Sequence, residues 1–139
     1  KVAWVVFVLL AIGIGLYPLI YIFATEDFGI LMNKSNDLLS NTVWKIAFYG
    51  HISFGGLALL VGWSQFIRKL RAKRLNLHRN LGKIYVISAL VSGLCGIYLG
   101  FFATGGIVSS IGFISLGLIW LFTTLRAYTA IKNKDAPLA

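Results

Sequence analysis

The chain has 139 residues, of which 58% are hydrophobic and only 12% charged, with 13 Lys and Arg against 4 Asp and Glu. A soluble domain carries about 25% charged residues, and a chain of this length cannot bury so much apolar surface in one core. The composition therefore excludes an ordinary soluble domain and indicates insertion into a membrane.

Four apolar runs follow one another along the chain, at about 2–23, 42–67, 81–103 and 107–131. Each reaches the length of about 20 residues that a helix needs to cross the hydrocarbon core. Pro18 is expected to kink the first helix without ending it, because neighbouring helices can satisfy the freed carbonyl. We therefore expect one all-α domain over residues 1–139, a four-transmembrane-helix bundle. The start at Lys1 is compatible with a fragment of a longer bundle.

The charges predict the orientation. The loop over residues 24–41 carries three acids and a single Lys34. The connection between spans two and three is basic throughout, with Arg68, Lys69, Arg71, Lys73, Arg74, Arg79 and Lys83. The positive-inside rule places this connection and both termini in the cytoplasm, and the loop outside. The short connection at Thr104, Gly105 and Gly106 predicts that spans three and four form an antiparallel hairpin.

Small and polar residues follow one side of span two. His51, Gly55, Ala58, Gly62 and Gln65 are spaced by four, three, four and three, which keeps them on one helical stripe. We expect this stripe to face other helices or a bound group, because lipid offers no partner to a histidine.

Spans three and four carry small residues at similar spacings. Ser92, Gly96 and Gly100 form a ladder in span three, and span four places Ser110 and Gly117 seven residues apart. Such small residues are typical of close helix packing in membranes.

An intramembrane histidine such as His51 has three interpretations. It could ligate a metal or haem b, with Gly55 one turn away leaving room for a flat macrocycle. It could bond or protonate a small ligand such as a quinone. It could also form an interhelical hydrogen bond to a serine or carbonyl, worth about 1 kcal/mol or less.

The second histidine is expected far from the first. His78 precedes span three on the cytoplasmic side, so the rise of ~1.5 Å per residue separates the two imidazoles by roughly 20 Å. One haem iron cannot reach both, and a bis-histidine haem would need a histidine from further sequence or a partner chain. The candidate cofactor-binding residues are His51, Gly55, Gln65 and His78.

The basic connection is expected to meet anionic lipid headgroups, at ~1 kcal/mol per residue. The candidate residues are Arg68, Lys69, Arg71, Lys73, Arg74 and Arg79. Nucleic-acid binding is not expected, because topology already accounts for the charge. A single Cys95 implies neither a disulfide nor a thiolate metal site. No catalytic constellation is visible, which favours a protein that is not an enzyme.

Several separated motifs resemble one known family. They are GHISFGGLALLVGWSQFI, LHRNLGKIY and the TGG turn, and over about 45–135 they resemble the DUF2306 family of bacterial predicted membrane proteins. The matching positions are His51, Gln65, His78, Arg79, Gly82 and Tyr85. The resemblance implies a further span that opens on a His-Arg-x-Trp-Met motif, whose histidine would lie near His78. It implies the architecture and no activity.

Two functions remain open. The first is a non-catalytic accessory subunit of a larger membrane complex, such as a respiratory complex, and the small-residue faces favour it. The second is a haem- or quinone-associated redox protein that uses His51 and, with a histidine beyond the chain, His78. A transporter is the weaker third hypothesis, because no broken helix pair or buried acid marks a substrate path.

Overall fold

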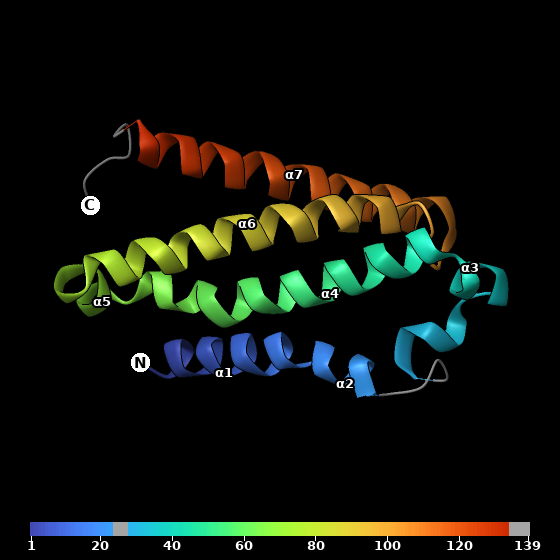
Figure 1. The fold of residues 1–139 in the computed structure, drawn as a ribbon, viewed down its shortest axis with the longest axis horizontal. Helices are drawn as coiled ribbons and strands as arrows, with labels where there is room; N and C mark the ends of the chain where they lie inside the picture. The colour runs from blue at the N-terminus through green and yellow to red at the C-terminus, as the bar shows by residue number, and fades with distance from the viewer. Residues whose placement is uncertain (24–27, 134–139) are drawn as a thin grey trace.

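The computed structural model describes residues 1–23 and 28–133, and this part of the chain contains helices and no strand (Figure 1). The elements are α1 (Val2–Leu16), α2 (Pro18–Phe23), η1 (Gly29–Asn33), α3 (Asn36–Ser40), α4 (Thr42–Gly62), η2 (Trp63–Phe66), α5 (Arg68–Lys73), α6 (Leu75–Gly100) and α7 (Gly106–Lys132).

Four helical stretches are long and apolar enough to cross a membrane: Val2–Phe23, Thr42–Phe66, Leu75–Gly100 and Gly106–Lys132. The predicted all-α architecture with four spans is confirmed. The third helix begins earlier than the apolar run that predicted it, at Leu75. Hydropathy locates the hydrocarbon boundary, whereas a helix continues into the polar region until a residue breaks it. His78 and Arg79 therefore lie on α6 and not before it.

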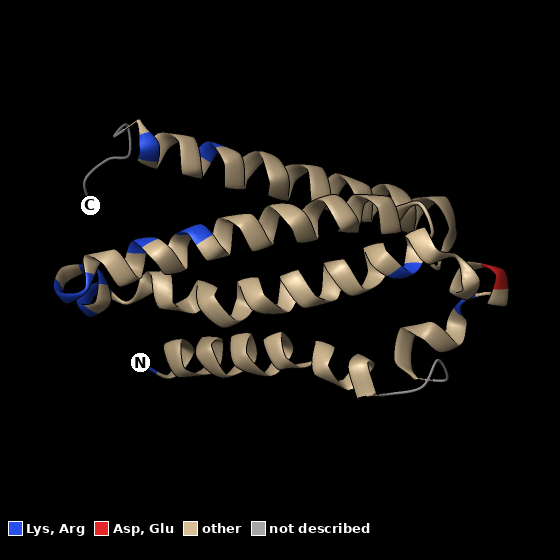
Figure 2. Ribbon diagram, in the orientation of Figure 1, with Lys and Arg blue, Asp and Glu red and all other residues tan. Residues whose placement is uncertain are grey.

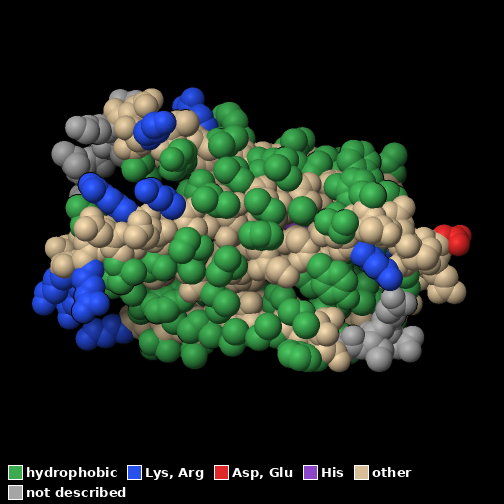
Figure 3. Space-filling view, viewed as in Figure 1, with side chains coloured by type: hydrophobic (Ala, Val, Ile, Leu, Met, Phe, Trp, Pro, Cys, Tyr) green, Lys and Arg blue, Asp and Glu red, His purple; other side chains and the backbone are tan. Residues whose placement is uncertain are grey.

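The four long helices lie side by side in a row (Figure 1). Helix α1 packs against α4, α4 against α6, and α6 against α7, so α1 and α7 are the two outer members. Hydrophobic side chains cover the length of the body, and most Lys and Arg side chains gather towards one end of it (Figure 3). Such an apolar surface is what a protein exposes to lipid chains.

Two adjacent glycines let α4 approach both of its neighbours. A Cβ at Gly55 would lie 3.0 Å from the Ser92 Oγ of α6. A Cβ at Gly56 would lie 2.6 Å from the Gly15 carbonyl oxygen and 2.9 Å from the Pro18 Cγ. Because any side chain at Gly56 would meet backbone, the crossing of α1 and α4 requires glycine there.

Pro18 interrupts the first helix without ending the span. Helix α1 stops at Leu16 and α2 starts at Pro18, with Tyr17 between them in right-handed helical geometry at φ −54° and ψ −36°. The expectation that the span continues past Pro18 is confirmed, although the helix itself is interrupted at Tyr17.

The ladder expected in span three divides between two neighbours. Ser92 and Gly96 face α4, whereas a Cβ at Gly100 would lie 2.9 Å from the Ile114 Cγ1 of α7. A spacing of four advances about 40° around an α-helix at each step, so the ladder drifts from one face of α6 to the next.

The connection between α6 and α7 is short and rich in glycine, as predicted. Gly105 and Gly106 have φ of 109° and 77°, in the region that glycine adopts without strain. This geometry turns the chain back on itself, and α7 then packs along α6 as an antiparallel neighbour.

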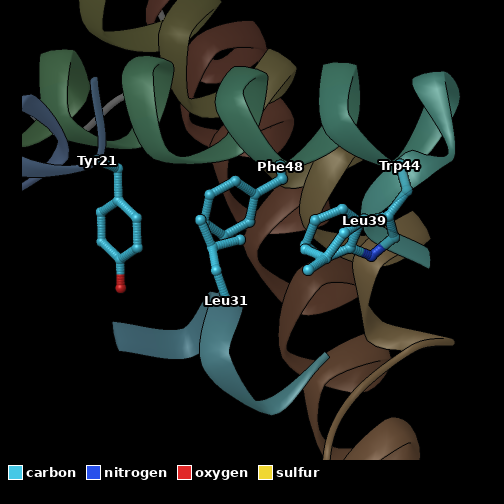
Figure 4. Packing of buried hydrophobic residues seen from close by; sticks show 5 residues of the cluster. All are labelled: Tyr21, Leu31, Leu39, Trp44 and Phe48. Atoms are coloured by element: carbon cyan, nitrogen blue, oxygen red, sulfur yellow. The ribbon is translucent and has the colours of Figure 1, made fainter. Parts of the chain in front are cut away.

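The segment between the first two spans is more than an acidic loop, and this is a correction to the sequence prediction. Leu31 of η1 and Leu39 of α3 are buried with Tyr21, Trp44 and Phe48 (Figure 4). Phe48 and Trp44 stack with centroids 5.2 Å apart and planes 10° apart. This cluster is the main buried hydrophobic group of the described residues. The predicted acids Glu26 and Asp27 lie outside those residues.

Side-chain caps stabilise the start of α3, within this segment, and the start of α4, which follows it. The Ser35 Oγ accepts a hydrogen bond from the Leu38 amide at 3.3 Å, and the Asn41 Oδ1 accepts one from the Trp44 amide at 3.0 Å. Each satisfies a backbone donor that a helix start leaves free.

Lys34 ties the segment to the α6–α7 turn. Its Nζ donates to the Phe102 carbonyl and, at 3.0 Å, to the Thr104 Oγ1. Partial burial lowers the pKa of Lys34 below its ordinary value of 10.5, because desolvation disfavours the charged amine.

Charge is distributed unevenly along the molecule (Figure 2). Most Lys and Arg residues lie on α5, on the first turns of α6 and at the end of α7, which is the end of the molecule where α1 starts. Asp37 lies at the opposite end and is the only acid in the part of the chain that the structure describes.

Candidate functional site

His51 lies on α4, half-buried, and bonds to one residue of α6. Its Nδ1 is 2.9 Å from the Ser92 carbonyl oxygen and 3.2 Å from the Ser92 Oγ. The Ser92 hydroxyl in turn donates to the His51 carbonyl oxygen at 2.9 Å. Because a carbonyl can only accept, the proton belongs on Nδ1, and in the neutral ring Nε2 is then the acceptor. This is the interhelical bond that the third interpretation of His51 describes.

The space around the imidazole is filled by α6. A Cβ at Gly96 would lie 2.9 Å from the His51 Cε1 and Nδ1, so the ring rests on this glycine. The space beside Gly55 holds the Ser92 hydroxyl, at 3.0 Å from the Cβ position. The expectation that Gly55 leaves room for a macrocycle is therefore wrong, because the neighbouring helix occupies that room.

The stripe on α4 faces α6 along its length. Gly62 lies under the Tyr85 ring, whose nearest carbons are 3.1 Å from the Cβ position. Gln65 reaches Gly82, with its Oε1 at 3.1 Å from the Cβ position there. Each step along α4 meets an earlier residue of α6, as an antiparallel pair requires. The expectation that the stripe faces another helix is confirmed.

Gln65, His78 and Gly82 form a second group, at the basic end of the bundle. The Gln65 Nε2 is 3.5 Å from the His78 carbonyl oxygen and 3.4 Å from the Ser64 Oγ, which are long distances for hydrogen bonds. The Nδ1 of His78 is buried and has no hydrogen-bond partner among the residues that the structure describes. The amide and the imidazole are thus held loosely by their own chain.

The two histidines, His51 on α4 and His78 on α6, lie far apart along the bundle, as the sequence predicts. His51 contacts Ser92, and His78 precedes Ser92 on the same helix by 14 residues, or about 21 Å. Within residues 1–23 and 28–133, no group of three or more His, Cys, Asp and Glu is placed to hold a metal ion. The two imidazoles do not form one site.

The basic connection folds into α5 and the first turn of α6. The six side chains that the sequence predicts to meet lipid headgroups are exposed there: Arg68, Lys69, Arg71, Lys73, Arg74 and Arg79. Arg68 and Arg71 also line a hollow of about 430 Å³ together with Gln65, Phe66 and Ile67. Contact with headgroups stays a prediction.

Two partners in these contacts escape the sequence patterns. Ser92 looks like one more small residue in a ladder, yet its hydroxyl and carbonyl both bond to His51. Gly56 lies beside the stripe and faces α1. The pair of adjacent glycines at 55 and 56 is the sequence signal that could have indicated the second contact of α4. Adjacent residues of a helix lie on different faces, so two adjacent glycines allow close contact with two neighbouring helices.

The comparisons agree with this architecture. The family described as "Predicted membrane protein (DUF2306)" matches residues 48–138, which is more than half of the chain. The chain belongs to this family, and the resemblance seen in its motifs is confirmed. No curated protein and no solved structure matches it.

Proposed function

We propose that this DUF2306 protein is a non-catalytic accessory subunit of a larger complex in the bacterial inner membrane, with both termini in the cytoplasm. The orientation is supported by the basic side chains on α5, on early α6 and at the end of α7, because such an excess marks cytoplasmic segments. The observation that carries the subunit role is the free face of α7.

Helix α7 packs against α6 and has no buried residue. Gly117 faces α6, with the Ile97 Cγ1 at 2.6 Å from its Cβ position. Gly112 and Ser115 lie on roughly the opposite side at ~100° per residue, and nothing lies within 4 Å of a Cβ at Gly112. We call the side that contains Gly112 and Ser115 the free face.

Small residues on a transmembrane helix are typical of a crossing with another helix, whereas large apolar residues suffice against lipid. The occupant that fits the free face is thus an apolar transmembrane helix of a partner subunit. That helix would cross at Gly112, where its backbone can approach closely.

The test is purification of the full-length protein from its own membrane in mild detergent. We expect it to elute with a defined complex of fixed stoichiometry, and Gly112→Ile to reduce that association about tenfold or more. The matched control is Gly13→Ile, which adds the same bulk at another glycine with open space around it. Elution as a monomer that carries its own cofactor, or an unchanged complex in Gly112→Ile, would overturn the proposal.

A redox role for His51 is the second candidate function, and one observation favours it. With Nδ1 bonded to the Ser92 carbonyl, Nε2 has no hydrogen bond to a described residue. Ligating histidines in proteins are often oriented this way by a bond from the other nitrogen. Because Ser92 fills the space beside Gly55, the arrangement suits a small quinol hydroxyl donating to Nε2 better than haem b.

An absorption spectrum and a quinone extraction of the purified protein decide this alternative. A Soret band that disappears in His51→Ala would support haem. Quinone retained by the wild type and lost in His51→Ala, but kept in His78→Ala, would support the quinol. Neither cofactor in the wild type ends the redox hypothesis.

A further inference from the structure

The hollow at the basic end of α4 combines two guanidinium groups with an amide. It is lined by Gln65, Phe66, Ile67, Arg68 and Arg71, with a volume of about 430 Å³. Arg68 and Arg71 are three residues apart on α5, which brings them to the same side of that helix. A guanidinium fork matches the oxygens of a phosphate and can bind two of them at once.

These arginines have no counter-ion from their own chain within residues 1–23 and 28–133. The acid described there, Asp37, lies at the other end of the molecule (Figure 2). The surrounding side chains on α5 and early α6 are themselves basic. Mutual repulsion in such a cluster is relieved by an anion from outside the chain.

Gln65 is available to a ligand. Its two hydrogen bonds, to Ser64 and to the His78 carbonyl, are at the long limit of 3.4 and 3.5 Å. Because bonds of this length are weak, the Gln65 amide can donate to an anion in the hollow at little cost.

An aromatic wall borders the hollow on its apolar side. Phe66 is exposed, and its ring meets Phe7 edge-on at 5.9 Å and Trp4 at 6.5 Å between centroids. Trp4 and Phe7 belong to α1, so the wall joins the hollow to the lipid-facing surface of the first span. A ligand that fits has a phosphate at one end and a hydrocarbon chain at the other.

We propose that this hollow binds the phosphate of one anionic phospholipid, with Arg68, Arg71 and Gln65 on the headgroup and the aromatic wall along its chain. The proposal goes beyond the subunit role and does not depend on it. It also gives Arg68 and Arg71 a different role from the other basic residues of the connection: these two contact one headgroup directly, whereas the others attract headgroups only by their charge.

Native mass spectrometry of the full-length protein with added phosphatidylglycerol or phosphatidylcholine tests the site. We expect phosphatidylglycerol to be retained and Arg68→Gln/Arg71→Gln to weaken its binding about tenfold or more. The matched comparison is Lys69→Gln/Lys73→Gln, which removes the same charge from α5 outside the hollow, and it should weaken binding clearly less than the arginine pair does, because these lysines contribute only diffuse attraction. Circular dichroism of both variants checks that they remain folded.

Three outcomes would overturn the proposal. An equal loss in both double variants means diffuse attraction and no site. Equal retention of phosphatidylcholine means that the anionic charge is not recognised. Displacement of the lipid by millimolar inorganic phosphate means that the site takes a free anion. Phe66→Ala gives a further check, because it should weaken lipid binding and leave any binding of inorganic phosphate unchanged.

Discussion

The two faces of α6 are built differently. Towards α4, side chains cross the interface and bond: Ser92 exchanges hydrogen bonds with His51, and the imidazole rests on Gly96. Towards α7, contacts are between glycine and aliphatic side chains, such as Gly117 with Ile97. The hydroxyl of Thr123 on α7 bonds back to carbonyls of its own helix, at 2.8 and 3.1 Å.

Because of this difference, the α4–α6 interface specifies the register of its two helices more strictly than the α6–α7 interface does. In a bilayer there is little hydrophobic force between helices, so packing and hydrogen bonds decide which helices associate and in what register. The α4–α6 pair has both, and its register is defined by the His51–Ser92 bonds. The α6–α7 pair has packing alone, with no side-chain hydrogen bond between the two helices among the described residues.

The largest expected effect comes from filling the glycine under the imidazole. Gly96→Val should cost about 2–3 kcal/mol of unfolding free energy, because the ring must leave Ser92. Gly117→Val should cost about 1 kcal/mol, because the Ile97 side chain can change rotamer, and Gly112→Val should stay within about 0.5 kcal/mol. Denaturant titration in detergent micelles measures all three. Equal costs for Gly96→Val and Gly117→Val would show that the two faces do not differ.

The next effect is the loss of the cross-helix bonds. Ser92→Ala should cost about 1 kcal/mol, and His51→Ala about 2 kcal/mol because it also leaves a cavity. Thr123→Ala, which removes only a bond within one helix, should stay within about 0.5 kcal/mol. The same titration checks these values, and the double variant of His51 and Ser92 should cost less than the two single changes together. Additive costs would argue against direct coupling.

The smallest effect concerns the bonds of Lys34, which tie the segment over 28–41 to the α6–α7 turn. Lys34→Met should cost only about 0.5 kcal/mol, since its bonds are exposed, but should speed amide exchange over 28–41. Burial lowers the pKa of Lys34, so between that lowered value and 10.5 the unfolded chain binds more protons than the folded one. The stability of this tie should therefore rise with pH across that window, and the rise should vanish in Lys34→Met. A pH dependence unchanged in the variant would contradict this assignment.

Much of the fold is predictable because lipid imposes simple demands on sequence. A run of about 20 apolar residues must become a helix, since no other structure satisfies its backbone inside hydrocarbon. The four spans, the kink at Pro18 and the glycine turn before α7 all follow from such local requirements. The segment over 28–41 does not, because Leu31 and Leu39 have neither the length nor the period of a span and are buried only in the tertiary cluster that they form with Tyr21, Trp44 and Phe48.

The candidate site is predictable in part. The spacing from His51 to Gln65 identifies a stripe that needs a partner, and the apolar runs separate His51 from His78. The spacing does not identify the partner, since Ser92 and Gly96 become its neighbours only through the antiparallel register of α4 and α6. For the same reason, the sequence suggested that the space beside Gly55 could hold a ligand, whereas in the fold the Ser92 hydroxyl occupies that space.

By itself the sequence determines that this protein is a membrane protein of four helical spans in the DUF2306 family, because hydropathy and motifs are properties of single segments. The tertiary structure alone decides which helix each glycine serves, that the His51 Nδ1 is bonded, and that Arg68 and Arg71 share a hollow with Gln65. Those facts depend on the distances between segments that are far apart in the chain. Helix packing determines these distances, and no local sequence pattern predicts them.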